Sequence, residues 1–283
     1  MSVTSFASLG LAEPLVNALN SAGLVTPTPI QAQAIPHLLD GRDLVGLAQT
    51  GTGKTVAFAL PLIQQLAYAD DRVMPGSARA LVLAPTRELA QQIADAFIAY
   101  SAPARLKVAV VFGGVGMVPQ IKALSRGVDI LVATPGRLID LMHQKAIRLD
   151  HTKRLVLDEA DRMLDMGFVR DVMKIVDRLP KHRHTLLFSA TMPDGVRHLV
   201  DDLLDEPVEV AVTPEVITVE RIEQRVYHVS RAAKRGFLVD LLDNPALKRV
   251  VVFTRTKHGA NRLAEQLGTS GITADAIHGN KSQ

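Results

Sequence analysis

The fold of this chain is decided by residues 48–55, which read AQTGTGKT. A short apolar run, residues 43–47, precedes the stretch, and a helix-permissive run, residues 56–60, follows it. The glycines therefore lie where a strand turns into a helix, which is the setting that a phosphate-binding loop requires. This context favours a phosphate-binding loop over a plain glycine-rich turn.

Each residue type in the stretch has a physical role in holding phosphate. Gly51 and Gly53 allow the backbone to curl so that successive N–H groups point at one anion, and the helix N-terminus adds partial positive charge. Lys54 supplies a full positive charge, and the hydroxyl of Thr55 can bind Mg²⁺. The expected ligand is a nucleoside triphosphate. Its expected binding residues are Thr50, Gly51, Thr52, Gly53, Lys54 and Thr55.

Length and composition bound the class of protein. A chain of 283 residues corresponds to about two domains of roughly 150 residues each. The N-terminus has no charged segment followed by an apolar one, and no run of about 18 apolar residues occurs, which argues against secretion and membrane spanning. The absence of cysteine excludes disulfides and thiolate metal sites and fits a reducing compartment. We therefore expect a cytoplasmic protein.

Charge is unevenly spread along the chain. Residues 1–219 contain 21 Lys and Arg against 23 Asp and Glu, whereas residues 220–283 contain 11 against 6. The C-terminal part therefore carries a net charge of +5, which is compatible with a polyanionic partner such as nucleic acid. A solvated face of Lys and Arg explains the same excess without a partner.

Near-continuous apolar runs alternate with helical patterns through the first two thirds of the chain. Runs of this kind are buried on both faces, which is typical of a parallel sheet flanked by helices. Catalytic residues then gather at the carboxyl ends of the strands. We expect an α/β domain whose strands are residues 43–47, 80–84, 107–112, 129–133, 154–157, 184–188 and 209–212.

Two helices are expected before the loop. Residues 11–22 have one apolar face, and Gly23 is expected to end this helix. A proline-rich bend over residues 26–31 then places Gln31 at the start of the second helix, which continues to Leu39.

A second α/β unit is expected to follow the first. The segment 201–214, which contains acidic residues and prolines, is the region in which we expect the linker. We assign the first domain to residues 1–212, the linker to 213–221 and an incomplete second domain to 222–283. In the second unit the expected strands and helices are residues 222–229, 234–242, 249–254, 259–267 and 272–276.

Asp158 and Glu159 close one of the buried strands and complete the pattern of a nucleotide hydrolase. A carboxylate at this strand end can hold Mg²⁺, and its neighbour can orient and deprotonate an attacking water. We assign the metal to Asp158 and the role of base to Glu159, with Lys54 as the third catalytic residue. The alternative is that the acidic cluster only favours the start of the following helix.

Residues 158–161 read DEAD, and together with the glycine-rich loop they make the chain resemble the DEAD-box family of RNA helicases. The family's phosphate-binding motif often begins with alanine, which accounts for Ala48 where the general pattern has glycine. The resemblance covers nearly the whole chain and is strongest to the bacterial RhlE-like subgroup. It implies RecA-like domains of the P-loop NTPase class, ATP and Mg²⁺ as cofactors, and RNA as the partner.

Gln31 lies in a segment that resembles the family's adenine-reading Q motif, and Phe6 matches the isolated aromatic residue upstream of that motif. An amide can donate and accept hydrogen bonds together, so Gln31 is expected to pair with the adenine edge. Leu24 stands where the family often has an aromatic residue, so stacking on adenine there is expected to be weaker.

Further segments resemble motifs that bind RNA or couple it to the nucleotide. In the family, three of them hold the sugar-phosphate backbone, which explains binding without sequence preference. Their residues here are Pro85, Thr86, Arg87, Gly113, Gly114, Thr134, Pro135, Gly136 and Arg137. Taken singly, residues 134–137 are equally typical of an ordinary turn. Ser189 and Thr191 match the coupling motif and are expected to hydrogen-bond Asp161.

Residues 252–255 and 278–283 resemble the next motifs of the family, but the chain contains no counterpart of its motifs V and VI. Motif VI supplies arginines that stabilise charge on the γ-phosphate, and loss of such an arginine costs on the order of 10³-fold or more in rate. We therefore expect a chain truncated within the second RecA-like domain.

The resemblance implies an ATP-dependent RNA helicase that locally unwinds short duplexes. One alternative is that the chain is an ATP- and RNA-binding module without efficient hydrolysis. A DNA-directed helicase of the same superfamily is a further alternative, which Gln31 and residues 158–161 disfavour.

Overall fold

The computed structural model describes residues 5–70, 72–212 and 223–281. The chain divides into two units, Met1–Ile217 and Thr218–Gln283, which are described separately. The predicted linker, residues 213–221, lies outside the described residues, so the predicted domain boundaries stay a prediction. Residues 201–212 are not a linker, because α9 (Asp194–Leu203) and β7 (Val208–Ala211) occupy most of them.

The first unit is built on a parallel sheet of seven strands in the order β3-β4-β2-β5-β6-β1-β7. The predicted α/β class is confirmed, and each predicted strand of this unit is present with its ends shifted by at most two residues. The strands are β1 (Leu44–Leu47), β2 (Ala78–Leu83), β3 (Val108–Val111), β4 (Val128–Ala133), β5 (Arg154–Leu157), β6 (His184–Ser189) and β7 (Val208–Ala211).

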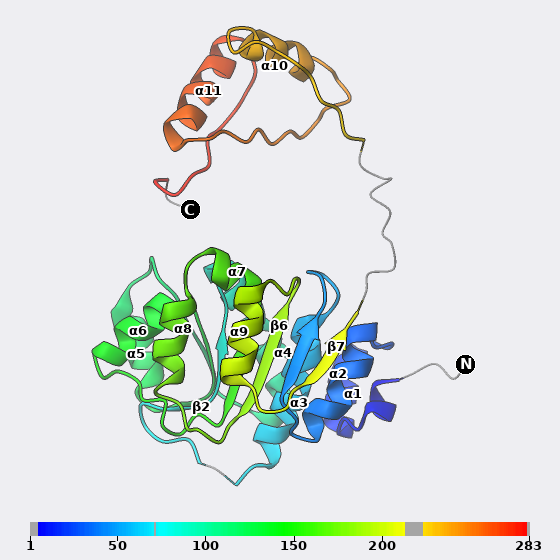
Figure 1. Cartoon of the computed structure of the whole chain (residues 1–283), viewed down its shortest axis with the longest axis vertical. Coiled ribbons are helices and arrows are strands. Elements are labelled where there is room, and N and C mark those ends of the chain that lie inside the picture. Colours follow the sequence, from blue (N-terminus) through cyan, green and yellow to red (C-terminus); the bar gives the residue numbers. More distant parts are fainter. Residues whose placement is uncertain (1–4, 71, 213–222, 282–283) are drawn as a thin grey trace. The chain divides into compact units, whose positions relative to one another are not determined.

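Two layers of helices cover the two faces of the sheet (Figure 1). Side chains alternate along each strand, so Val156 of β5 packs in one core cluster and its neighbours Leu155 and Leu157 pack in the other. One face is covered by η1 (Phe6–Leu9), α1 (Glu13–Ser21), α2 (Pro29–Leu39), α3 (Lys54–Tyr68), α4 (Arg87–Ser101) and η2 (Ala102–Ala104). The other is covered by α5 (Met117–Leu124), α6 (Pro135–His143), α7 (Ala160–Asp165), α8 (Val169–Val176) and α9.

Gly46 allows β1 to lie close to the side chain that packs on it. A Cβ atom at this position would lie 2.5 Å from the ring of Phe188 on the neighbouring strand β6. The Phe188 ring in turn packs 5.3 Å from that of Phe58 on α3, measured between centroids. The strand before the glycine-rich loop and the helix after it are therefore held against the same aromatic side chain.

The N-terminal segment differs from its prediction. Residues 11–22 are not one helix, because α1 begins at Glu13 and a short 3-10 helix, η1, precedes it. The second helix begins at Pro29 instead of Gln31, since proline is well suited to the first turn of a helix. Gly23 does follow the first helix and has a φ of 77°, as expected of a helix-ending glycine.

The second unit contains its predicted helices, as α10 (Lys234–Leu242) and α11 (Lys257–Thr269). The predicted strands are wrong for the described part, residues 223–281, in which no strand is present. A strand requires a hydrogen-bonded neighbour, and these apolar segments have none here. Phe253 and Ile277 are consequently 93% and 95% exposed.

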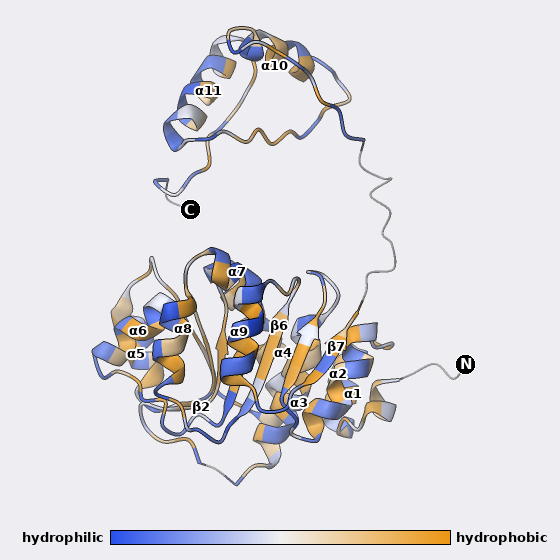
Figure 2. Ribbon diagram, viewed as in Figure 1, coloured by the Kyte–Doolittle hydropathy of each residue, from blue (hydrophilic) through white to orange (hydrophobic). Residues whose placement is uncertain are grey.

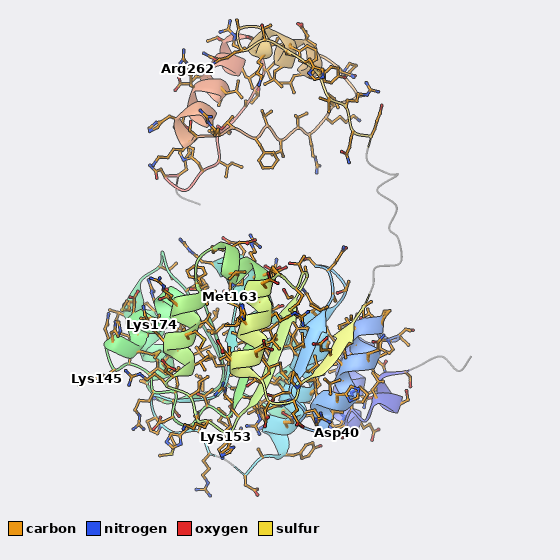
Figure 3. The ribbon with its side chains drawn as sticks, viewed as in Figure 1. Asp40, Lys145, Lys153, Met163, Lys174 and Arg262 are labelled. Carbon is orange, nitrogen blue, oxygen red and sulfur yellow. The ribbon has the colours of Figure 1, made fainter. Side chains whose placement is uncertain are left out.

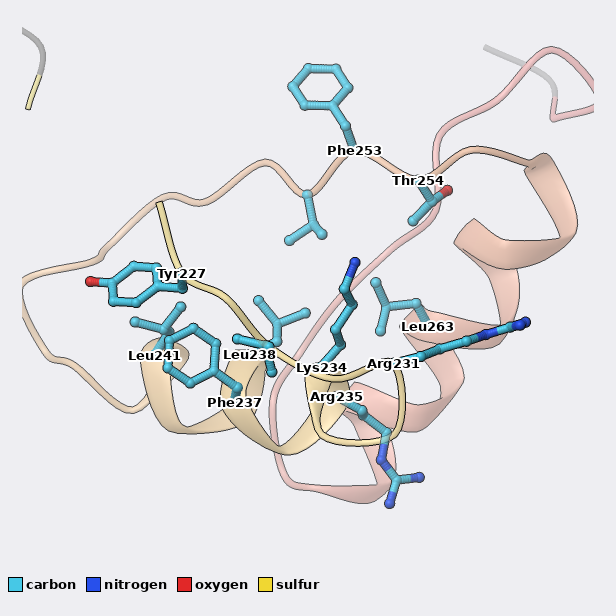
Figure 4. A pocket seen from close by; sticks show the side chains of 12 residues that line it. Tyr227, Arg231, Lys234, Arg235, Phe237, Leu238, Leu241, Phe253, Thr254 and Leu263 are labelled. Carbon is cyan, nitrogen blue, oxygen red and sulfur yellow. The ribbon is translucent and has the colours of Figure 1, made fainter. Parts of the chain in front are cut away.

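A hollow of about 490 Å³ lies on the second unit. Figure 4 shows Tyr227 beside Phe237 and Leu241, whereas Phe253 points away from them. The Tyr227 and Phe237 ring centroids are 4.8 Å apart. The apolar residues are therefore only partly collected into a core.

Hydropathy follows this architecture. In Figure 2 the central strands of the first unit are apolar, and its helices show mixed apolar and polar surfaces. None of the helices among the described residues combines the length and apolar character needed to cross a membrane.

Candidate active site

Parallel strands bring the carboxyl ends of the sheet to one edge, and the predicted site residues follow these ends. Asp40 and Lys153, which precede β1 and β5, lie at the opposite edge, and Met163 of α7, which follows β5, lies toward the first (Figure 3). The strand order separates the predicted residues into two adjacent groups. The nucleotide residues follow β5, β6 and β1, and the backbone-binding residues follow β3, β4 and β2.

The glycine-rich loop joins β1 to α3 and has the conformation that its glycines permit. Gly51 and Gly53 have φ values of 86° and 91°, in the left-handed region that favours glycine. Gly53 is the residue that caps the N-terminus of α3. A Cβ atom there would lie 2.3 Å from Nε2 of Gln31, so both the backbone angle and the available space require glycine.

Lys54 opens α3 and is buried, with 7% of its surface exposed. Its Nζ atom has no hydrogen-bond partner among the residues that the structure describes. An ammonium group in this situation is costly unless an anion neutralises it. The loop, the helix N-terminus and the buried ammonium together fit a phosphate group.

Asp158 follows β5 and is 2% exposed. Burial raises the pKa of its carboxyl group from 3.8 to about 6, the positive charge of Lys54 acts in the opposite direction, and the charge of Glu159 raises it further. The backbone N–H of Glu159 donates to Oδ1 of Asp158 at 3.0 Å. Lys54 and Asp158 therefore face each other electrostatically in one site, although 104 positions separate them in the numbering.

Glu159 is held in a strained backbone conformation. Its φ and ψ are 54° and 53°, a left-handed conformation that is uncommon for a residue with a side chain. Strain of this kind costs on the order of 1–3 kcal/mol and concentrates at functional sites. The carboxylate forms an ion pair with Arg162 of α7, with an Oε2 to Nη1 distance of 3.1 Å.

Asp161 connects α7 to the segment after β6. Its Oδ2 accepts hydrogen bonds from the backbone N–H of Thr191 at 2.9 Å and from the Thr191 hydroxyl at 2.8 Å. Its own N–H donates to the Ser189 hydroxyl at 3.2 Å. The predicted hydrogen bonds are present, and the coupling role assigned to these three residues stays a prediction.

Gln31 joins the second helix to the loop. Its Oε1 accepts a hydrogen bond from the N–H of Thr28 at 2.9 Å, and its Nε2 donates to the carbonyl of Gly53 at 3.1 Å. The amide retains one further lone pair and one further N–H for a ligand. Phe6 is 2% exposed and packs in the core below this region, so its predicted contact with a nucleotide stays a prediction.

The loop after β3 lies between residues from β2 and β4. Arg87, at the start of α4, packs against Gly114, where a Cβ atom would lie 2.1 Å from the Arg87 guanidinium. Arg137 of α6 donates from both terminal nitrogens to the carbonyl of Val115 at 3.2 Å. The predicted residues Pro85, Thr86, Arg87, Gly113, Gly114, Thr134, Pro135, Gly136 and Arg137 thus follow three adjacent strands.

Arg137 differs from what its predicted role requires. Its side chain is only 10% exposed, because the guanidinium is directed at the neighbouring loop. Arg87, by contrast, is exposed. The structure therefore presents Arg87 to a ligand in solution but turns Arg137 inward.

A family model described as "DEAD/DEAH box helicase" matches residues 28–199. The match covers the loop, both acidic residues and the Asp161 network. This chain belongs to the DEAD/DEAH box helicase family.

Relatives of this DEAD/DEAH box protein carry the same family description. The chain is 45% identical over 282 residues to "RNA helicase CrhR" of a Synechocystis strain and 41% identical over 281 residues to "DEAD-box ATP-dependent RNA helicase CshA" of Geobacillus kaustophilus. Each match covers 99% of this chain, which spans 56% and 59% of the lengths of those proteins. The RhlE-like subgroup stays a prediction.

A solved structure has the same fold. It is the crystal structure of a DEAD box protein from the hyperthermophile Methanococcus jannaschii, with a TM-score of 0.69 and 36% sequence identity. The similarity covers 98% of this chain and 74% of that one. The RecA-like architecture predicted for the DEAD/DEAH box domain is therefore confirmed.

Sequence reasoning missed three residues that shape the DEAD/DEAH box site. Thr28 stands three positions before Gln31, a spacing typical of a capping box that could have been recognised. Arg162 stands three positions after Glu159, a spacing at which charged side chains on a helix can meet. Gln120 carried no signal, because its importance arises from the loop against which it folds.

Replacing Asp158 by asparagine is expected to stabilise the free protein. The folded pKa lies above the ordinary one, so ionisation disfavours folding: the free energy of unfolding decreases as pH rises from about 4 to about 6 and stays lower above that. A shift of this size corresponds to about 2–3 kcal/mol. Calorimetry should therefore give Asp158→Asn a Tm several degrees above the parent at pH 7.5, with the difference vanishing near pH 4.

Asp161→Asn is the matched control for this experiment. Burial alone would raise the pKa of Asp161, but hydrogen bonds from Thr191, Arg162 and Ser189 outweigh it and lower the pKa. Its ionised form is therefore favoured in the folded protein, and removing the charge should lower the Tm. An Asp158→Asn protein that melts at or below the parent temperature at pH 7.5 would contradict the assigned burial penalty.

Proposed function

We propose that the protein is an ATP-dependent RNA helicase that holds the RNA backbone and separates short duplexes locally. The observation that carries the proposal is the buried ammonium of Lys54, which lacks a hydrogen-bond partner among the described residues and faces the buried carboxylate of Asp158. A site built in this way is completed by an anion that brings a cation with it. A nucleoside triphosphate with its metal ion has this chemistry.

ATP would be bound at both of its ends by residues of this chain. The loop amides at Gly51 and Gly53 and the ammonium of Lys54 hold the phosphates. At the other end, Gln31 uses its remaining N–H and lone pair on the adenine edge. Because the Gln31 side chain already bonds Gly53, recognition of the base is connected directly to the shape of the phosphate loop.

The donor atoms fit one magnesium ion that is shared with the substrate. No group of three or more His, Cys, Asp or Glu residues that could hold a metal ion occurs in the part of the chain that the structure describes. Thr55 and Asp158 are oxygen donors and would hold Mg²⁺ together with phosphate oxygens, as this ion prefers. When bound, the ion bridges phosphate oxygens and neutralises charge that develops on them.

Glu159 is the proposed base. Its carboxylate is fixed by the strained backbone and by Arg162, so it can orient a water molecule and take its proton. Asp161, on the helix that Glu159 begins, is bonded to Thr191 after the next strand. Movement of the segment after β6 would therefore be transmitted to the catalytic carboxylates, which supports coupling between hydrolysis and RNA.

RNA would lie along the ends of β3, β4 and β2. Exposed backbone and an exposed guanidinium at Gly114 and Arg87 suit a sugar-phosphate chain, and no base-reading groove is needed. The net charge of +5 in residues 220–283 favours the same partner. Binding to the backbone alone would make the enzyme indifferent to RNA sequence.

A second candidate is that these 283 residues bind ATP and RNA without efficient turnover. It is favoured by the second unit, whose described residues form no sheet and leave Phe253 and Ile277 almost fully exposed. A unit in this state does not offer a rigid surface that could complete the hydrolytic site.

Hydrolysis of ATP with and without nucleic acid tests both candidates. We expect single-stranded RNA to stimulate phosphate release by this chain several-fold more than DNA of the same sequence. Binding of ATP and RNA without stimulated release would favour the second candidate. Stimulation by DNA in preference to RNA, or no binding of either ligand, would contradict the proposed function.

A further inference from the structure

The loop after β3 is held from below by a side chain outside every motif considered above. Gln120 lies on α5, and its Nε2 atom donates hydrogen bonds to the carbonyls of Phe112 and Gly116, each at 3.2 Å. One amide group therefore joins the two ends of the loop. Gln120 is 8% exposed, so these bonds are shielded from water.

The orientation of this amide follows from its surroundings. If the nitrogen and oxygen atoms were exchanged, Oε1 would face two carbonyl oxygens, which would repel it. In the orientation present, Oε1 is buried and has no hydrogen-bond partner among the described residues. Such a group carries a desolvation cost, which is accepted here in order to hold the loop closed.

Arginine side chains hold the loop at two other points. The guanidinium of Arg87 packs on Gly114, and that of Arg137 bonds the carbonyl of Val115. With Gln120 these contacts come from α4, α5 and α6, so three elements define the shape of five residues. Gly114, Val115 and Gly116 remain exposed, so the loop offers its backbone to a ligand in a preformed shape.

We propose that Gln120 is a positioning residue for nucleic-acid binding, which sets the Phe112–Gly116 loop in the shape that grips the sugar-phosphate backbone of single-stranded RNA. The inference rests on the proposed function, because it requires RNA to bind at the ends of β3, β4 and β2. Gln120 itself does not touch the RNA. It acts through the loop, since a preformed loop loses less conformational entropy when it binds.

Two variants of the full chain test this role. Gln120→Leu keeps the side-chain bulk and removes both hydrogen bonds to the loop. Gln65→Leu is the matched control, because Gln65 on α3 also donates from Nε2 to a backbone carbonyl, that of Leu38 at 2.6 Å, but lies away from the loop. Binding of a fluorescein-labelled ten-residue oligouridylate is measured by anisotropy from 50 to 300 mM KCl, with Mg²⁺ and a non-hydrolysable ATP analogue.

We expect Gln120→Leu to weaken RNA binding by about tenfold or more, which corresponds to the loss of one hydrogen bond to a charged group. The slope of log affinity against log salt should decrease in magnitude by about 0.7–1.4, the effect of one or two lost phosphate contacts. Affinity for the ATP analogue should stay within about twofold of the parent. A merely structural defect would lower both affinities together, and Gln65→Leu should change neither.

Wild-type chain that binds RNA, together with Gln120→Leu that has the same affinity and salt slope, overturns the inference and leaves the proposed function intact. Wild-type chain that does not bind RNA overturns both. If Gln120→Leu does not fold, Gln120→Glu replaces it, since this variant keeps the shape but places a carboxylate against the two carbonyls. The same loss of affinity and slope then supports the inference, and unchanged values overturn it.

Discussion

Lys54→Ala is expected to abolish ATP binding at micromolar protein concentration. The variant removes the one full positive charge that the loop directs at the phosphates, from a position that is 7% exposed. Loss of one member of a buried charge pair costs about 2–5 kcal/mol, so affinity should fall by roughly a hundredfold or more. Isothermal titration with ATP and Mg²⁺ measures the loss directly.

The control for this variant is Lys153→Ala, which removes an exposed lysine at the opposite edge of the sheet (Figure 3). It should bind ATP as the parent does. The melting temperature of Lys54→Ala distinguishes a lost contact from a lost fold, because a folded variant without affinity supports the assignment. A folded Lys54→Ala protein with parental ATP affinity would show that the triphosphate is not held by this loop.

Glu159→Gln should bind ATP and RNA as the parent does but hydrolyse ATP about 10²–10⁴-fold more slowly. The amide keeps the size and position of the carboxylate but cannot accept a proton from water. The lost ion pair with Arg162, whose side chain is 55% exposed, should matter little for folding, because exposed pairs contribute about 0–1 kcal/mol. The variant is therefore expected to trap ATP together with RNA.

Single-turnover hydrolysis and the rate of RNA release measure the two halves of this prediction. Glu209→Gln, which neutralises an exposed glutamate on the edge strand β7, is the control and should leave both rates unchanged. RNA-stimulated hydrolysis at the parental rate by Glu159→Gln would remove Glu159 from the role of base. A variant that neither hydrolyses nor binds would instead place Glu159 in the binding of the nucleotide.

Local pattern was sufficient for most elements of the first unit. Apolar runs and the glycines around Lys54 predicted the sheet, its parallel sense and the loop, because these features depend on neighbours along the chain. The N-terminal helices were less accurate: Pro29 begins α2 two residues before Gln31, and the helix predicted from residue 11 begins at Glu13. These differences reflect the details of capping, which a periodic apolar pattern does not contain.

The strands predicted for the second unit show where local pattern fails. Residues around Phe253 have the apolar character of a buried strand, yet they are extended and exposed in the structure. Apolar character makes a segment suitable for a sheet, but the hydrogen bonds of a strand must come from a neighbouring strand. The pattern therefore identified a tendency whose fulfilment depends on residues elsewhere.

Residue types and their order along the chain were enough to predict a triphosphate loop, an acidic strand end and the class of fold, because each depends on a few adjacent positions. The sequence did not reveal that β6 lies between β5 and β1, which places Ser189 between the groups that carry Lys54 and Asp158. Nor did it reveal that Gln120 holds the loop beside Arg87. Strand order and buried contacts are set by packing between distant segments, so only the folded chain brings these side chains together.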